Sequence, residues 1–243
     1  MKVGVYYYHL LSLASDPHRI RTVEEFTESA RRFASTYKQF PAEADHELVV
    51  VFLRGHPSDV DRSIWDGIPC RFIHYNPSPE HEWAWAMQHA LYDDPCDFMV
   101  HFVSRAHFHR PGWLRRVVDE RMNHGDGLYG SMAAYGGCPL KTHPEPNPHL
   151  RGTMWAWDRE TINLFPHRVL TMEDDYRLEC GEWNLSLYYE AIGKPSMLVT
   201  FDGCYSRTDW DKPPNTFCKG DQSNLLNWDR HTDAYRLGVP LRP

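Results

Sequence analysis

The stretch from Arg105 to Arg110 concentrates side chains that could hold phosphate or metal. A guanidinium is always charged and pairs bidentately with phosphate oxygens, so Arg105 is a candidate for binding a diphosphate. His107 and His109 alternate and would share one face of an extended segment, where neutral imidazoles can bind a transition metal. No neighbouring Asp or Glu completes an obvious ligand set. We therefore favour phosphate-facing or structural roles for these histidines over metal binding.

Three consecutive carboxylates form a second candidate site. Glu173, Asp174 and Asp175 are adjacent in the sequence, and a carboxylate can accept a proton from a reacting group. A helix or a strand would point the three side chains in different directions, so the sequence does not choose firmly among them. A solvated acidic turn or the first turn of a helix explains the triplet equally well.

Aromatic side chains offer stacking surfaces in two places. Trp155 and Trp157 alternate and therefore share a face, which could stack on a sugar or a flat base, although packing in a core is the commoner fate of such a pair. Tyr6, Tyr7 and Tyr8 are consecutive. Alternation along a strand turns at least one of them inward, so Tyr8 could stack on a base or simply pack.

The pattern of apolar residues predicts strands alternating with helices. A Thr-Val-Glu-Glu capping box at 22–25 opens a helix with an apolar stripe to Tyr37, and Pro-Gly at 111–112 precedes another helix. Such alternation implies an α/β fold with crossover connections and a mostly parallel sheet. Predicted strands cover 3–8, 47–53, 70–75, 97–103, 127–134, 151–157 and 197–201, and further helices cover 78–91 and 182–192.

The stretch 97–114, DFMVHFVSRAHFHRPGWL, resembles a pattern of GT-A glycosyltransferases that are similar to family two. In that family a hydrophobic strand leads to an Asp-x-Asp motif, and Pro-Gly-Trp-Leu then opens a helix. The motif's carboxylates hold a divalent cation against the donor diphosphate. Aligned on Pro-Gly-Trp, the motif positions are Ser104, Arg105 and Ala106, so the carboxylates are absent here.

Two further segments extend the resemblance over residues 1–205. The stretch 149–160 looks like the acceptor-side strand of the family followed by a turn into a helix. Residues 173–175, ahead of Gly-Glu-Trp at 181–183, resemble the acidic segment from which inverting members draw a catalytic base. The resemblance therefore implies Asp174 as the base, with Glu173 as the neighbouring candidate.

The resemblance also implies an α/β, GT-A (Rossmann-like) fold in one domain over residues 1–243. Residues 1–125 would bind the nucleotide sugar, 126–205 would face the acceptor, and 206–243 would form an irregular tail. The donor should lie over the carboxyl ends of the parallel strands. Expected donor contacts are Tyr7, Tyr8, His9, Arg54, Ser104, Arg105 and His107, and expected acceptor contacts are Trp155, Trp157 and Glu182.

The activity implied is that of a hexosyl- or pentosyltransferase that moves a sugar from a nucleotide-sugar donor to an acceptor, with inversion. Arg105 could replace the metal electrostatically, so we expect no required cofactor unless the degenerate motif still binds Mn²⁺ or Mg²⁺. The acceptor could be a glycan, a small molecule or a modified nucleobase in DNA, since some phage enzymes of this general family glycosylate hydroxymethylated bases. The formal charge of −7 argues against a general electrostatic grip on nucleic acid.

Two other functions stay open. The lost Asp-x-Asp motif favours a catalytically silent GT-A-like module that binds a glycan or a protein, and His101, His107 and His109 could build a metal-dependent hydrolase. The composition, 42% hydrophobic and 24% charged, is that of a globular protein. We expect no membrane span and a cytoplasmic location, with six widely spaced cysteines that stay reduced.

Overall fold

An eight-stranded sheet organises the chain. The computed structural model describes residues 1–10, 23–53, 61–75, 94–135 and 147–240. The strands lie in the order β10-β9-β5-β8-β4-β1-β2-β3, and a separate pair joins β6 to β7. The strands are β1 (Val3–Leu10), β2 (Glu47–Leu53), β3 (Cys70–Tyr75), β4 (Phe98–Phe102), β5 (Leu128–Gly130), β6 (Ala133–Ala134), β7 (His149–Leu150), β8 (Met154–Asp158), β9 (Ser196–Val199) and β10 (Cys204–Ser206).

Most of the sheet is parallel. β1 pairs in parallel with β2 and β4, β2 with β3, and β5 with β9. β8 runs antiparallel between β4 and β5, and β10 folds back on β9. The expected single-domain α/β fold with a mostly parallel sheet is confirmed.

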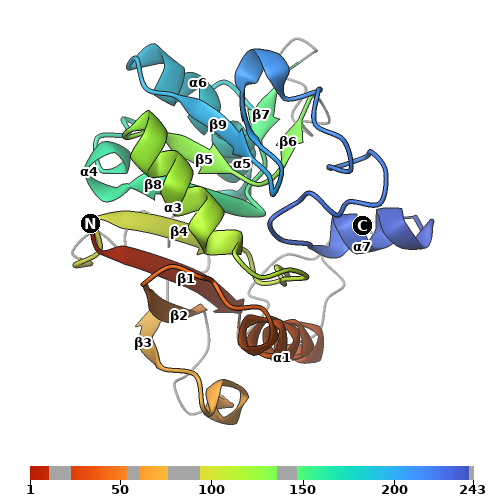
Figure 1. The fold of residues 1–243 in the computed structure, drawn as a ribbon. Coiled ribbons are helices and arrows are strands. Elements are labelled where there is room, and N and C mark those ends of the chain that lie inside the picture. The colour runs from red at the N-terminus through yellow and green to blue at the C-terminus, as the bar shows by residue number, and fades with distance from the viewer. Residues whose placement is uncertain (11–22, 54–60, 76–93, 136–146, 241–243) are drawn as a thin grey trace.

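Helices cover both faces of the sheet (Figure 1). Tyr7 packs on the face covered by α1 and α3, whereas Tyr6 and Tyr8 pack on the face covered by α5 and α6. Strands buried on both faces explain why β1 and β2 are almost uninterrupted apolar runs. The helices are α1 (Val23–Gln39), α3 (Trp113–His124), α4 (Arg159–Ile162), α5 (Met172–Glu179), α6 (Leu185–Ala191) and α7 (Arg230–Leu237), with 3₁₀ turns at Arg62–Trp65 and Arg207–Asp209.

Part of the C-terminal segment, which the sequence predicted to be irregular, is a helix. Residues 230–237 form helix α7 because Asp229 caps it, accepting hydrogen bonds from the backbone N–H groups of His231 and Thr232. Gly238 ends the helix in the left-handed conformation, at φ 64°. The helix lies at the end toward which β1 runs (Figure 1).

Other predicted elements have different bounds in the structure. The strand predicted over 127–134 becomes two short strands, β5 and β6, and the helix predicted over 182–192 becomes α6. The helix predicted over 78–91 lies outside the described residues. Within the described part of the chain, every helix is too short or too polar to cross a bilayer.

Candidate functional site

The turn after β4 presents Ser104 and Arg105 at the carboxyl edge of the sheet. The backbone N–H of Ala106 donates to the carbonyl of Val103 at 2.9 Å, which closes a β-turn around these two residues. The Tyr7 hydroxyl donates to the carbonyl oxygen of Ser104 at 2.7 Å and fixes the turn to β1. The Arg105 guanidinium lies over the ring of Phe26 on α1, 5.6 Å from its centroid. This turn holds the residues that the resemblance aligns with the Asp-x-Asp motif.

Strand pairing brings Arg151 to the same edge. β8 runs antiparallel to β4, with Met154 opposite Phe102, so the residues before β8 adjoin the residues after β4. The carbonyl of Thr153 accepts a hydrogen bond from the N–H of Val103 at 3.4 Å, which continues the pairing past the strand.

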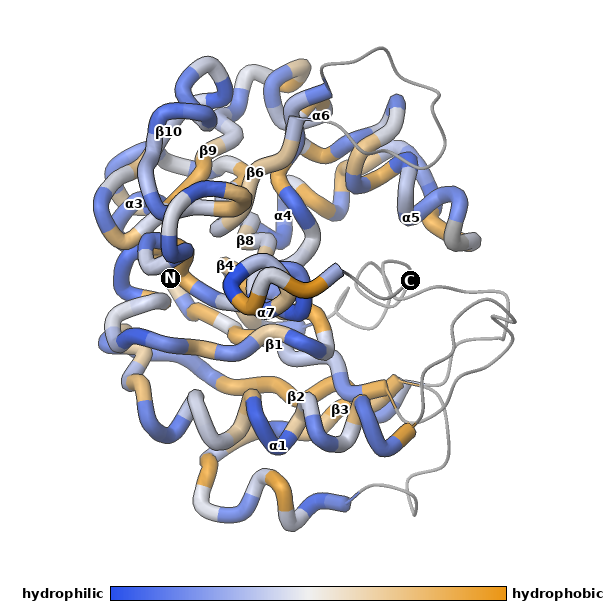
Figure 2. Tube along the Cα trace, turned by 90° about the vertical axis from the view of Figure 1, so that its right-hand side faces the viewer, coloured by the Kyte–Doolittle hydropathy of each residue, from blue (hydrophilic) through white to orange (hydrophobic). Residues whose placement is uncertain are grey.

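The C-terminal segment brings two more cationic residues. The backbones of His107 and Trp228 exchange two hydrogen bonds of 2.9 Å, which anchors the segment beside the β4 turn. Arg230 and His231 follow as the first residues of α7. Figure 2 shows α7 in front of β4 and β1 when the molecule is viewed onto this edge.

Arginine side chains converge on His231. Its Nε2 lies 3.4 Å from a terminal nitrogen of Arg151 and 3.3 Å from Nε of Arg230. Guanidinium groups only donate, so Nε2 must accept and the ring is neutral. Burial lowers the pKa of His231 to about 3, and the charges of Arg151, Arg230 and Arg105 act in the same direction. We call Arg105, Arg151, Arg230 and His231 the arginine cluster.

Carboxylates partly balance the arginine cluster. Glu179, the last residue of α5, lies with Oε1 3.8 Å from Nε of Arg151. The same oxygen accepts a hydrogen bond from the N–H of Gly152 at 3.0 Å. The charge of Arg151 also acts on the buried carboxylate of Asp229, which caps α7. Guanidinium groups at the carboxyl edge of an α/β sheet suit a phosphorylated ligand.

Asp174 forms the capping box of α5. Its Oδ2 accepts from the N–H groups of Leu170 and Thr171, each at 3.1 Å, and the Thr171 hydroxyl accepts from the N–H of Asp174. Oδ1 accepts from Arg177 at 3.2 Å. A carboxylate offers about four lone-pair sites, so these bonds leave roughly one lone pair on Oδ1 for another proton donor. Its predicted role as a base stays a prediction.

The remaining acidic candidates gather around Arg177. Oε1 of Glu173 lies 2.5 Å from a terminal nitrogen of Arg177, and Oε1 of Glu182 lies 3.0 Å from Nε of the same arginine. Both carboxylates are exposed. Asp175 is buried on the side of α5 that also carries Glu179, one turn later. An ion network local to α5 therefore explains Glu173 and Glu182 without a bound acceptor.

The structure does not bring the three candidate metal histidines together. His101 is buried within β4, and its Nδ1 lies 2.8 Å from the Tyr8 hydroxyl. His107 is buried with Nε2 3.5 Å from Asp233, and burial lowers its pKa to about 4. The Nε2 of His109 lies 2.6 Å from the Leu225 carbonyl, and its ring stacks on Trp228. Each of the three imidazoles thus lies beside different protein groups.

The expected donor contacts on β1 are all buried. Tyr7 stacks on Phe33 with ring centroids 4.0 Å apart, and Tyr8 packs on the opposite face. His9 is 2% exposed, and neither ring nitrogen has a hydrogen-bond partner among the residues that the structure describes. Burial lowers the pKa of His9 to about 4 against the charge of Asp61. Since buried polar atoms are normally paired, the orphaned nitrogens of His9 at the end of β1 suit a ligand. Arg54 lies outside the described residues.

Trp155 and Trp157 do not face an acceptor. They are 1% and 2% exposed, in the core on the α5 and α6 face of the sheet. The ring of Trp157 packs against His101 at a centroid distance of 4.4 Å, and Nε1 of Trp155 donates to the carbonyl of Leu150. The prediction that they contact the acceptor is therefore corrected to core packing, because β8 is covered on both faces.

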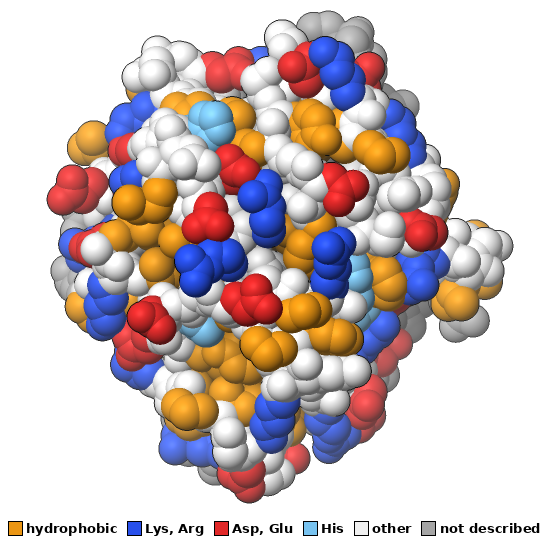
Figure 3. All heavy atoms as spheres, viewed as in Figure 1, with side chains coloured by type: hydrophobic (Ala, Val, Ile, Leu, Met, Phe, Trp, Pro, Cys, Tyr) orange, Lys and Arg blue, Asp and Glu red, His pale blue; other side chains and the backbone are white. Residues whose placement is uncertain are grey.

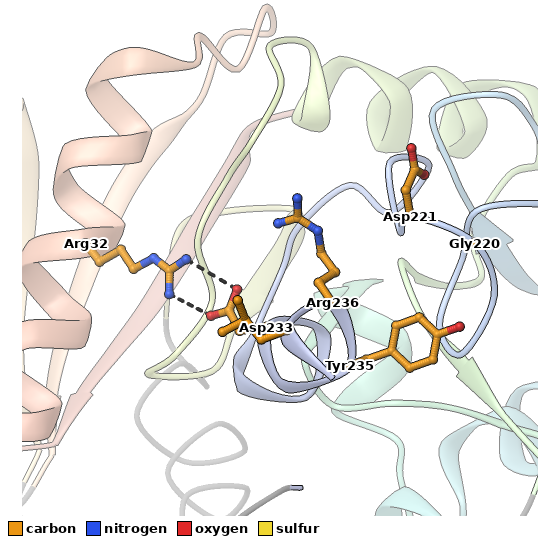
Figure 4. A pocket seen from close by; sticks show the side chains of 7 residues that line it. Arg32, Gly220, Asp221, Asp233, Tyr235 and Arg236 are labelled. Atoms are coloured by element: carbon orange, nitrogen blue, oxygen red, sulfur yellow. Dashed lines mark hydrogen bonds and ion pairs between the residues drawn. The ribbon is translucent and has the colours of Figure 1, made fainter. Parts of the chain in front are cut away.

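A hollow of about 660 Å³ adjoins α7 (Figure 4). In it, Arg32 of α1 forms two hydrogen bonds with Asp233, the shorter of 2.6 Å. The Arg236 guanidinium lies over the ring of Trp228 at 3.7 Å. The hollow is lined by Arg32, Gly220, Asp221, Asp233, Tyr235, Arg236 and Leu237. It is therefore a polar neighbour of the arginine cluster and not the cluster itself.

Solved structures match the chain at low sequence identity. A protein described as a glucose-1-phosphate thymidylyltransferase from Bacillus anthracis matches with 14% identity and a TM-score of 0.53, over 80% of this chain and 85% of its own. The chain shares its α/β fold. A protein described as a nucleotide-diphospho-sugar transferase from Desulfovibrio desulfuricans matches with 13% identity and a TM-score of 0.43, over 73% of this chain and 76% of its own. No family model matches the sequence, and no curated protein matches it significantly.

A divalent cation does not fit the turn after β4. Mg²⁺ and Mn²⁺ prefer carboxylate oxygens, and the motif positions here hold Ser104, Arg105 and Ala106. Of the carboxylates described beside Arg151, Glu179 pairs with that arginine and Asp229 caps α7. We therefore derive no step through a metal at this site.

Sequence reasoning missed most of the arginine cluster. Arg230 and His231 lie in the segment expected to be irregular, and Glu179 was not a candidate. The capping signals of α7, Asp229 before the helix and Gly238 after it, were available in the sequence. The contact of Arg151 with His231 joins residues 80 positions apart, so only the folded chain shows it.

Proposed function

We propose that the protein is a glycosyltransferase whose donor diphosphate binds to the arginine cluster. The observation that carries the proposal is the convergence of Arg105, Arg151 and Arg230 on a neutral His231. The convergence lies at the carboxyl edge of a sheet whose fold occurs in a thymidylyltransferase. Guanidinium groups would stabilise the negative charge that develops on a departing nucleoside diphosphate, as the metal does in enzymes with Asp-x-Asp.

The reaction follows from this placement of charge. An acceptor oxygen or nitrogen forms a bond to the anomeric carbon of the donor while the bond from that carbon to the diphosphate oxygen breaks. The nucleoside diphosphate leaves with the electron pair and meets the arginine cluster. A carboxylate takes the acceptor's proton, for which we propose Asp174 through the open lone pair of Oδ1, with Glu173 as its neighbour.

We assign His9 and Glu179 to supporting roles. We propose that His9, near the end of β1, adjoins the nucleobase; its buried ring nitrogens have no partner in the described part of the chain. Glu179 bridges Arg151 and the N–H of Gly152, and so positions the guanidinium for the diphosphate.

A test measures release of nucleoside diphosphate with chelator present, from UDP-, GDP-, dTDP- and CDP-sugars and with glycans, small alcohols or hydroxymethylated DNA as acceptors. We expect release from one donor, its loss in Asp174→Asn and its persistence in Glu173→Gln. Asparagine keeps an oxygen that can cap α5, so the first variant retains the fold. Unchanged release in Asp174→Asn contradicts the assignment of the base.

One observation favours a second candidate, the catalytically silent binding module. The Asp174 carboxylate already accepts hydrogen bonds from two backbone N–H groups and from Arg177. If this capping role is its whole role, the protein binds a nucleotide sugar but releases no diphosphate with any acceptor. Binding without turnover in the same assay would establish this candidate.

DNA is the least favoured acceptor. On the face shown in Figure 3, acidic and basic side chains are interspersed. Proteins that bind nucleic acid usually gather basic side chains in a patch or stripe, and the formal charge of this chain is −7. We therefore propose a glycan or a small molecule as the acceptor.

A further inference from the structure

We infer that Glu120, His124 and Cys204 form a site for one divalent transition metal, with zinc as the best fit. The site lies between α3 and the edge strand β10, whereas the arginine cluster lies where β4 ends. β9, β5 and β8 separate β10 from β4 in the sheet. The site is thus distinct from the proposed diphosphate site, and the inference does not rest on the proposed transferase activity.

The geometry of the three side chains suits chelation. Glu120 and His124 are four residues apart on α3 and therefore share a face, with Oε2 and Nε2 3.3 Å apart. The Cys204 sulfur completes the set, and the three ligand atoms all lie within 4.8 Å of one another. Zinc bonds of roughly 2.0–2.3 Å hold tetrahedral ligands about 3.3–3.8 Å apart. The 3.3 Å between Oε2 of Glu120 and Nε2 of His124 falls within this range.

A neighbouring arginine orients the carboxylate. A terminal nitrogen of Arg116 donates to Oε1 of Glu120 at 2.6 Å, and Nε of Arg116 donates to the carbonyl of Thr200 at 3.1 Å. Oε2 of Glu120 is left facing His124. Carboxylate ligands in metal sites are commonly held in this way by an outer hydrogen bond. Arg116 therefore fixes the ligand without occupying the oxygen that would bind the metal.

The three types of ligand indicate which class of metal ion would bind. Mg²⁺ and Ca²⁺ take oxygen ligands only, whereas an imidazole, a carboxylate and a thiolate together suit zinc. Three protein ligands leave a fourth position for water. Among the residues that the structure describes, this is the one group of three such side chains close enough to share an ion. Its consequence would be to tie the three-residue edge strand β10 to α3.

The test uses cobalt as a spectroscopic substitute for zinc. Reduced full-length protein is titrated with Co²⁺, and a near-ultraviolet thiolate-to-cobalt charge-transfer band is expected at one ion per chain, displaced by one equivalent of Zn²⁺. Cys204→Ser should abolish the band. His124→Gln, at an exposed position that does not threaten folding, should weaken zinc binding by at least about tenfold. Cys70→Ser, a partly buried thiol on β3 outside the group, is the matched control and should keep both signals.

Several results would overturn the inference. The site does not exist if the unmodified protein shows no charge-transfer band, or if the band survives in Cys204→Ser. Equal zinc affinity in His124→Gln and in the unmodified protein would also refute it. Equal loss in Cys70→Ser and Cys204→Ser would assign the signal to unspecific thiol binding.

Discussion

Replacing Arg105 should weaken diphosphate binding without unfolding the protein. Arg105 is partly buried in the turn after β4 and lies over the Phe26 ring, so Arg105→Gln removes the charge but keeps most of the packing stem. A hydrogen bond to a charged group contributes about 1.5–3 kcal/mol. At about 1.4 kcal/mol per decade, Kd for pyrophosphate should rise roughly tenfold to a hundredfold.

Isothermal titration calorimetry with pyrophosphate in chelator measures this change at low and high salt. Because the site is partly open to solvent, the loss should shrink as salt screens the charges. Arg115→Gln is the matched control, because Arg115 lies on the outer surface of α3 with its side chain 57% exposed. Unchanged affinity in Arg105→Gln, or an equal loss in Arg115→Gln, would refute the assignment of the arginine cluster.

Three further predictions concern stability and protonation. Asp174→Ala should lower the free energy of unfolding by about 0.5–2 kcal/mol through loss of the capping box, measured by urea unfolding; an unchanged midpoint would contradict the cap. Trp157→Ala should cost about 3–5 kcal/mol as a core truncation, and a near-neutral effect would place the ring outside the core. The pKa of His9 is about 4 in the folded protein, below its ordinary 6.5. Neutral His9 therefore contributes fully to the free energy of unfolding above pH 6.5, and this contribution is lost as pH falls toward 4. His9→Gln should therefore reduce the slope of unfolding free energy against pH in that window by up to about 1.4 kcal/mol per unit, and an identical slope would show that His9 is not buried neutral.

The strands and crossover helices followed from local patterns. β1 and β2 are continuous apolar runs, and the stripe of Phe26, Ala30 and Phe33 faces the core as its spacing predicts. Such signals need only neighbouring residues, so one sequence contains them. β8 was predicted as a strand, but its antiparallel direction between β4 and β5 depends on pairing across the sheet.

The candidate site was predicted only in part. Arg105 was expected at the diphosphate because the turn after β4 has a recognisable place in the resemblance. Arg151, Arg230 and His231 join it through contacts between distant parts of the chain, which no local pattern encodes. The two tryptophans illustrate the opposite error, since alternation predicts a shared face but not whether α5 and α6 cover that face.

We propose that arginine side chains, and not a divalent cation, hold the donor diphosphate. Thermal unfolding of the protein with UDP-, GDP-, dTDP- and CDP-sugars, each with Mn²⁺ and with chelator, tests it most directly, because a ligand of the folded state raises the midpoint. We predict that one nucleotide sugar raises the midpoint equally under both conditions. If stabilisation requires Mn²⁺, or if none of the four nucleotide sugars stabilises the protein, the arginine cluster does not hold the diphosphate in this way.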